Sequence, residues 1–181
     1  MNNMDIFGDT KGEATYDPSL DENKFVVVPE GDYEAHAHSL ELKENVTVRG
    51  KFLSDIFVPV FKIASGEFKN RKVKSKGFFR FKNPDKEKFP NLSDNSGSNK
   101  GYMSLVQSLG VETSSEEKDG KTIFKLPFLE QSHIEGKPVI IRIEHDSWTN
   151  NNGEDVITPK ATSVYKWESG KAVVDDSNLP F

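Results

Sequence analysis

The sequence predicts a mostly β fold with one short helix, arranged as a single small barrel between two polar ends. Apolar and polar residues alternate along several short segments, which is the two-residue period of a strand. Only the segment around residue 105 has the three- and four-residue spacing of an amphipathic helix. With 181 residues the chain can bury one core and carry flexible ends, but it is short for two cores.

The first elements are an acidic arm and a bent strand. Residues 1–24 are polar and acidic without a sustained period, so we expect a flexible arm. Order begins at Phe25, where a β-branched run precedes a turn, and a strand follows through residues 33–42. The alternation changes phase near His38 or Ser39, which predicts a β-bulge there.

Two further strands precede the helix. Residues 52–63 are apolar at both odd and even positions, as in a central strand with both faces covered. Pro59 cannot donate to the hydrogen-bond ladder, so we expect it at an edge position or a bulge. The next strand is expected over 71–81, and residues 91–100 form a loop rich in Ser, Asn and Gly.

The helical spacing is carried by four apolar residues: Tyr102, Leu105, Val106 and Leu109. Ser98 or Asn99 is available as the N-cap, and Gly110 stands where a left-handed residue ends a helix. A charged loop is expected over 113–121, and the pattern leaves open the type of the apolar segment 122–129.

Two last strands complete the arrangement. They are expected over 138–145 and 161–167, with a strong turn signal at 150–153 between them. About five strands with a helix before the fourth is the pattern of the OB fold, a five-stranded Greek-key β-barrel whose face binds oligonucleotides or oligosaccharides. We therefore expect an OB-like domain over 25–168, between the arm at 1–24 and a disordered acidic tail at 169–181.

The charge of the chain is unevenly distributed. The formal net charge of -5 alone argues against binding to nucleic acid. However, residues 1–34 hold nine acids and two lysines, whereas residues 62–82 hold eight bases and one acid. This asymmetry predicts a basic binding strip beside acidic appendages.

The strand at 71–82 carries the strongest functional pattern. Since successive strand residues point to opposite faces, one face presents six residues: Lys72, Lys74, Lys76, Phe78, Arg80 and Lys82. Val73, Phe79 and Phe81 fall on the other face, and the row of cations is extended by Lys62, Lys69 and Arg71. Cations neutralise phosphates and a ring stacks on any base, so this row predicts sequence-independent binding of single-stranded DNA. The alternative is an ordinary solvated edge strand with Phe78 in the core.

Other aromatic residues could supply stacking platforms, with a place in the core as an equal alternative for each: Phe57, Phe61, Trp148, Tyr165 and Trp167. We expect Trp148 to be the most exposed of them, because it stands next to the Asn-rich turn.

The C-terminus is a second functional pattern. An acidic end that finishes on Phe offers a partner protein carboxylate side chains, an aromatic ring and the terminal carboxylate. The residues expected to dock on a partner are Asp175, Asp176, Leu179, Pro180 and Phe181. The alternative is a tail that has no partner.

Patterns that would indicate an enzyme are missing from the sequence. There is no cysteine, no phosphate-binding Gly-rich loop and no nucleophile elbow. His36 and His38 would share a strand face, but no third ligand accompanies them. We expect no catalysis, no metal and no cofactor. Without a signal-like start or an apolar stretch of roughly 20 residues, we expect a cytoplasmic protein.

The tail at 175–181 resembles the acidic tip of bacterial single-stranded DNA-binding proteins, which ends in Ile-Pro-Phe. The body resembles phage-encoded single-stranded DNA-binding proteins in the segments 28–33, 65–71 and 136–139. This resemblance implies an OB fold, a role in phage DNA replication, recombination and repair in the host cytoplasm, and recruitment of replication or repair enzymes by the tail. It also implies a monomer or a homodimer.

Two other functions remain open at this stage. The first is a phage structural or interaction module, or an inhibitor of a host enzyme, whose binding would be indifferent to salt. The second is a mediator of single-strand annealing or recombination, which would use the same surface in a multimer.

Overall fold

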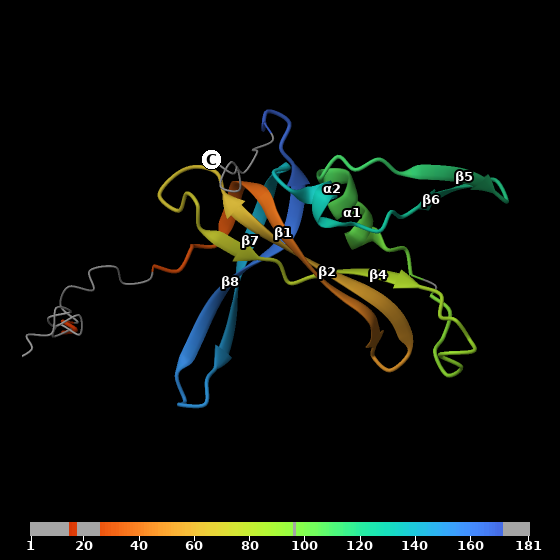
Figure 1. The fold of residues 1–181 in the computed structure, drawn as a ribbon, viewed down its shortest axis with the longest axis horizontal. Coiled ribbons are helices and arrows are strands. Elements are labelled where there is room, and N and C mark those ends of the chain that lie inside the picture. Colours follow the sequence, from red (N-terminus) through yellow and green to blue (C-terminus); the bar gives the residue numbers. More distant parts are fainter. Residues whose placement is uncertain (1–14, 18–25, 96, 172–181) are drawn as a thin grey trace, which may run out of the picture.

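Antiparallel strands dominate the computed structural model, which describes residues 15–17, 26–95 and 97–171 (Figure 1). The elements in chain order are β1 (Gly31–Val48), β2 (Phe52–Ile63), β3 (Lys72–Lys74), β4 (Phe78–Lys82), α1 (Lys100–Ser108), β5 (Ser114–Lys118), β6 (Lys121–Lys125), α2 (Gln131–Ile134), β7 (Pro138–Thr149) and β8 (Asp155–Lys166). The predicted mostly β class is confirmed, and α2 is a short helix that the sequence did not predict.

The main sheet has the strand order β3–β2–β1–β7–β8, and β4 pairs with β2 alongside β3. Its strand pairs are antiparallel. An isolated parallel bridge joins Ser75, directly after β3, to Ala161 in β8. At the same place the Lys76 N–H donates a hydrogen bond to the Ala161 carbonyl at 3.1 Å. The hairpin of β5 and β6 forms a separate two-stranded sheet.

The core lies between the inner sides of the main strands and α1. The largest fully buried side chains include Tyr102, Phe57, Phe61, Leu105, Ile141 and Ile143. The apolar stripe of α1 faces this cluster, and the Ser108 hydroxyl ties the helix to β8 by donating to the Val164 carbonyl at 2.9 Å. Burial of these side chains is the main favourable term in folding, at roughly 25 cal/mol per Å² of apolar surface.

Two predicted irregularities of the strands are confirmed. The register of β1 against β2 shifts between Ala37 and Ser39, so the bulge lies where the alternation changes phase. Pro59 lies between the part of β2 that pairs with β3 and the part that pairs with β4. The Pro59 carbonyl accepts a hydrogen bond from the Ser75 N–H. The Pro59 nitrogen, which has no hydrogen to donate, faces the same gap, so no hydrogen bond of the sheet is lost.

The predicted single strand over 71–81 is wrong, because the chain breaks into β3 and β4 at Ser75–Gly77. Val60 is opposite Lys74 and Phe57 is opposite Phe78, so three steps along β2 match four steps along its partner. One residue is therefore inserted, as in a β-bulge. Gly77 lies in the insertion with φ of 105°, and a Cβ atom there would be 2.9 Å from Ile56 Cγ2.

Several boundaries also differ from the sequence predictions. The first strand begins at Gly31, and residues 26–29 have no regular structure, whereas Phe25 is outside the described residues. The charged loop predicted over 113–121 is instead half of the β5–β6 hairpin. The helix is confirmed, with Asn99 as N-cap and Gly110 at φ of 66° after its end. No helix among the described residues could cross a membrane.

Candidate functional site

The inserted residue at Ser75–Gly77 changes which side chains point outward. Val73 is buried, so Lys72, Lys74 and Lys76 point away from the core. Beyond the insertion the phase is reversed, because Phe78 is opposite the buried Phe57. Phe79 and Phe81 therefore join the three lysines on the side of β2, β3 and β4 that faces away from the core, which we call the outer face. The predicted face that combined Lys72, Lys74 and Lys76 with Phe78, Arg80 and Lys82 is wrong.

Arg80 and Lys82 bind a buried carboxylate. Asp55 in β2 is 1 % exposed, and it lies 2.7 Å from Lys82 Nζ and 3.5 Å from Arg80 Nη1. The Asn45 N–H also donates to it, and Arg80 donates to the Leu126 carbonyl. Since a buried carboxylate needs compensating charge, these two cations stabilise the fold rather than an outward binding strip.

Two of the outward lysines are paired with acids at the surface. Lys74 Nζ lies 2.5 Å from Glu41 of β1, and Lys76 Nζ lies 2.9 Å from Asp146 of β7. The hydrogen bond that the Lys76 ammonium donates to Asp146 raises the pKa of Lys76 above its ordinary value. All four side chains remain about half exposed, so each pair contributes little to stability, on the order of 0–1 kcal/mol. A phosphate group can therefore compete for either lysine.

Three other cations have no ion pair within the described part of the chain: Lys62, Lys69 and Lys72. Lys62 and Lys72 are direct cross-strand neighbours on the outer face. Lys69 belongs to the turn between β2 and β3. Arg71 differs from them, because its guanidinium donates to the Val26 carbonyl at 2.8 Å. The positive charge that is available on this side is thus concentrated at the end of β2 and the start of β3.

An aromatic hollow lies at the other end of the outer face. It is lined by Val48, Arg49, Phe52, Phe79 and Phe81, and its volume is about 510 Å³. The rings of Phe79 and Phe81 are stacked at 5.9 Å with an angle of 16°, and Phe52 meets Phe81 edge-on at 6.4 Å. Phe79 is 38 % exposed, which leaves its ring accessible. The hollow thus offers aromatic surface beside a cation, Arg49.

The rings predicted as stacking platforms have different places in the structure. Phe57 and Phe61 are fully buried, so for them the prediction is wrong. Phe78 is half-buried against the core, which is the alternative considered for it. Trp148 is 55 % exposed, and its expected exposure is confirmed. Tyr165 is exposed beneath the guanidinium of Arg142 at 5.6 Å, and Trp167 is half-buried beside the His36 ring at 5.5 Å.

Two hairpins project from the body in diverging directions, one made of β1 and β2 and the other of β7 and β8 (Figure 1). The aromatic hollow lies at the β1–β2 turn, which is the tip of the first hairpin, and Trp148 lies on the second. The ion pair of Lys76 with Asp146 connects the end of β3 to the second hairpin. The Lys76–Asp146 ion pair thus links the outer face to the hairpin that carries Trp148.

The phase reversal explains why sequence reasoning missed Phe79 and Phe81, whereas Phe52 and Arg49 were missed for another reason. An uninterrupted alternation over 71–82 places both Phe79 and Phe81 inside. The signal that could have corrected this is Gly77, since glycine within a strand pattern often marks a bulge. Arg49 and Phe52 flank a turn, and only the folded hairpin brings them to β4.

The structure does not describe one part of the predicted site. The predicted partner-docking residues, Asp175, Asp176, Leu179, Pro180 and Phe181, lie outside the described residues. Among residues 15–17, 26–95 and 97–171, no group of three or more His, Asp or Glu side chains is placed to hold a metal ion. No protein-family model matches the sequence, and no curated protein matches it either.

Proposed function

We propose that this chain binds single-stranded DNA with little dependence on sequence, through the outer face of β2, β3 and β4. The observation that carries the proposal is the combination on that face of an accessible phenylalanine pair with lysines that have no ion-pair partner among the described residues. Phe79 and Phe81 supply the rings, and Lys62 and Lys72 supply the charge.

The arrangement favours a single strand over a duplex. A base can stack on Phe79 only when it is free of its complementary strand, because duplex bases are covered by their neighbours. Stacking on an aromatic side chain contributes roughly 1–3 kcal/mol per base and tolerates any base. The lysines add attraction to phosphates that is equally independent of sequence.

The proposal includes the fold: we expect the main sheet to be an OB-type barrel. Its support is the strand order β3–β2–β1–β7–β8 together with the parallel bridge from Ser75 to Ala161, which is where β3 and β8 would close a barrel. The helix α1 precedes β7, the fourth of these five strands along the chain. In OB folds the second and third strands and the two flanking hairpin loops bind oligonucleotides, which corresponds to the outer face here.

Two acids compete with DNA phosphates for lysines of the outer face. Glu41 and Asp146 occupy Lys74 and Lys76 in the free protein, so a strand of phosphates must displace them. Weak anions gain little from this exchange, whereas a polyanion gains from several lysines at once. The net charge of -5 is compatible with this function because the binding charge is local.

The proposal is tested by fluorescence anisotropy with a labelled oligo-dT of about 30 nucleotides at low and high salt, with duplex DNA of equal length as competitor. We expect the protein to bind oligo-dT more weakly as the salt concentration rises, and we expect the duplex competitor not to displace the oligo-dT. Phe79→Ala should weaken binding by about 5- to 100-fold, the equivalent of one lost stacking contact.

Phe124→Ala is the matched control, because Phe124 is 50 % exposed but belongs to the β5–β6 hairpin, which pairs with no strand of the main sheet. This variant should bind like the parent chain. Failure to bind oligo-dT at low salt, or equal displacement by duplex, would refute the proposal. Recruitment of replication or repair proteins by Asp175–Phe181 stays a prediction, to be checked by pull-down with and without these residues. The lack of catalytic activity stays a prediction as well.

A further inference from the structure

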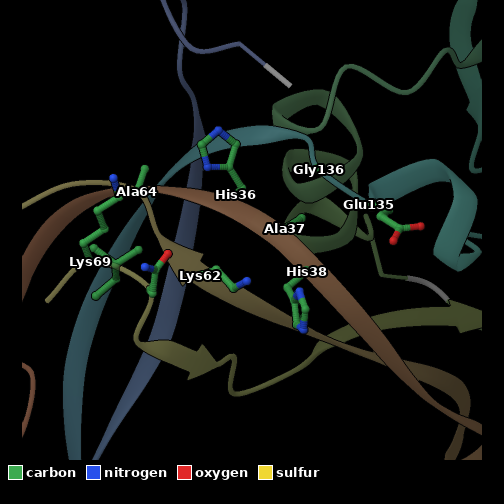
Figure 2. Close-up of a pocket in the computed structure, with 10 residues that line it drawn as sticks. His36, Ala37, His38, Lys62, Ala64, Lys69, Glu135 and Gly136 are labelled. Carbon is green, nitrogen blue, oxygen red and sulfur yellow. The ribbon is translucent and has the colours of Figure 1, made fainter. Parts of the chain in front are cut away.

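A second hollow, of about 350 Å³, lies where β1, the β2–β3 turn and the turn before β7 meet (Figure 2). Its polar lining comprises His36, His38, Lys62, Lys69, Asn70 and Glu135. Figure 2 shows Lys62 and Lys69 on one side of the hollow and Glu135 on the other, with both histidines from β1 between them. Two histidines that have no third ligand for a metal thus adjoin two lysines.

The charge of this hollow is positive and uncompensated. Neither Lys62 nor Lys69 has an ion pair within the described part of the chain, and Glu135 has none there either. With two lysines and one glutamate, the lining carries one net positive charge even when both histidines are neutral. An anion is therefore the class of ligand that this lining attracts.

The backbone does not supply the donors for such an anion. The N–H groups of Ala64, Asn70 and Gly136 already donate to carbonyls within the fold. His36 Nε2 lies 2.9 Å from the Lys171 carbonyl and donates to it. The remaining donors are the two lysine ammonium groups and the side chain of Asn70, a set suited to a tetrahedral oxyanion with several acceptor oxygens.

The hollow continues the outer face. In the sheet register His36 is opposite Lys62, and Lys62 is opposite Lys72, so a cross-strand row leads from the hollow to the lysines of β3. A phosphate in the hollow would therefore belong to the same chain of phosphates that passes over Lys72. This continuity favours a nucleic-acid phosphate over an unrelated anion.

We propose that this hollow is a discrete phosphate-binding site, which holds one phosphate of the bound strand between Lys62 and Lys69. The inference rests on the proposed binding of single-stranded DNA. It adds that the strand is anchored at one defined point beyond β3, and that Asn70 takes part beside the lysines.

The test uses the double variant Lys62→Ala/Lys69→Ala of the full chain. One lost phosphate contact on a single strand should flatten the slope of log K against log salt by about 0.7, and should weaken oligo-dT binding at 50 mM salt by about eightfold. The matched control is Lys118→Ala/Lys121→Ala, which removes the same charge from the exposed β5–β6 hairpin. Oligo-dT with and without terminal phosphates distinguishes an internal phosphate from a terminal one. A terminal site predicts that only the phosphorylated form loses affinity in the variant.

A second measurement is independent of DNA binding. Titration of the full chain with inorganic phosphate should shift the amide NMR signals of His36, Lys62 and Asn70 in the parent chain, but not in the double variant. Absence of these shifts, together with a double variant that binds DNA like its control, would overturn the site. If the parent chain binds no DNA but phosphate still shifts the signals, the site stands and only the proposed function fails. If truncation after Lys171 alone shifts the signals, the acidic end of this chain occupies the hollow and the phosphate assignment is wrong.

Discussion

Asp55 shows how one buried carboxylate fixes the roles of two cations. It is 1 % exposed, and Arg80 and Lys82 converge on it while their own side chains are about a quarter exposed. Arg80 Nε and Asp55 Oδ2 have no hydrogen-bond partner within the described residues, so the pair depends on charge rather than on ideal geometry. The stability of this group therefore depends on the Asp55 carboxylate that both cations contact.

We expect Asp55→Asn to lower the free energy of unfolding by about 3 kcal/mol, because it leaves Arg80 and Lys82 without a compensating charge. The matched control is Glu41→Gln, which removes the exposed partner of Lys74 and should cost less than about 1 kcal/mol. Urea denaturation of both variants measures the difference. Equal effects would show that Asp55 is not the anchor of these cations.

Gly77 has a different role, since it allows the insertion that turns Phe79 outward. Its φ of 105° and the 2.9 Å approach of a would-be Cβ to Ile56 Cγ2 both exclude a side chain without rearrangement. Gly77→Ala should destabilise the protein by about 1–3 kcal/mol. Gly101→Ala is the control, and its expected effect has the opposite sign. Gly101 is in α1 and a Cβ atom there would lie in open space, so alanine should stabilise the protein by up to about 1 kcal/mol. Thermal melts of the two variants that shift in the same direction would contradict this account.

At the scale of elements, the β5–β6 hairpin is set apart from the main sheet. All ten residues of its two strands are exposed, including the large side chains of Ile123 and Phe124. Its strands pair only with each other. An isolated two-stranded hairpin is marginally stable in water, so it contributes little to the stability of the rest of the chain.

Replacement of 115–124 by a two-residue Asn-Gly turn between Ser114 and Lys125, which are already opposite each other, tests this independence. The free energy of unfolding should change by less than about 0.5 kcal/mol, because no buried contact is lost. Urea denaturation followed by tryptophan fluorescence is a suitable measurement, since both tryptophans lie outside the hairpin. A loss of several kcal/mol would mean that the hairpin is part of the cooperative unit.

The sequence predicts elements well where local pattern and tertiary environment agree. The range of β2, the bulge near His38 and the helix α1 all follow from periodicity or turn chemistry that acts within a few residues. The β5–β6 hairpin was missed because its ten residues are exposed, so no buried face imposes an alternation on them. The break between β3 and β4 was missed because a single inserted residue reverses the phase without changing the composition.

The candidate site was only partly predictable for a related reason. Lys62, Lys69 and Lys72 were recognised by residue type alone, since long cations are seldom buried. Phe57 and Phe61 could not be distinguished from surface rings, because β2 is apolar at both odd and even positions. The pairing of Lys82 with Asp55 joins residues 27 positions apart, and only the folded sheet shows it.

At the scale of the whole molecule, charge and burial are arranged in separate zones. The outer face carries Lys62, Lys72, Lys74 and Lys76, whereas the interior of the described part holds the Asp55 carboxylate, on which two cations converge, and a large apolar cluster around Tyr102. Tyr102 is fully buried, and its hydroxyl donates to the Pro127 carbonyl at 2.7 Å and accepts from the Leu129 N–H at 3.2 Å. This single hydroxyl thus fastens the segment before α2 to the helix α1, and its burial raises the pKa of Tyr102 to about 12.

The raised pKa of Tyr102 links the stability of the whole fold to alkaline pH. The folded protein holds the tyrosine proton more tightly than the unfolded chain, whose tyrosines titrate near pH 10, so the stabilisation is complete below pH 10 and is lost as the pH rises toward 12. A difference of about two pKa units corresponds to a fall of roughly 2–3 kcal/mol in the free energy of unfolding over this window.

Tyr102→Phe separates this effect from other alkaline titrations. At pH 8 the variant should be less stable by about 1–2 kcal/mol, since the Leu129 N–H loses its partner in the core. Between pH 10 and 12 its stability should fall less steeply, so the two curves of unfolding free energy against pH converge. Tyr165→Phe is the control for the loss of a tyrosine hydroxyl at the surface, because Tyr165 is 42 % exposed and the variant should be about as stable as the parent chain at pH 8. Parallel curves for the parent chain and Tyr102→Phe would mean that this hydroxyl ionises as readily in the folded protein as in the unfolded chain, which its two short contacts and complete burial argue against.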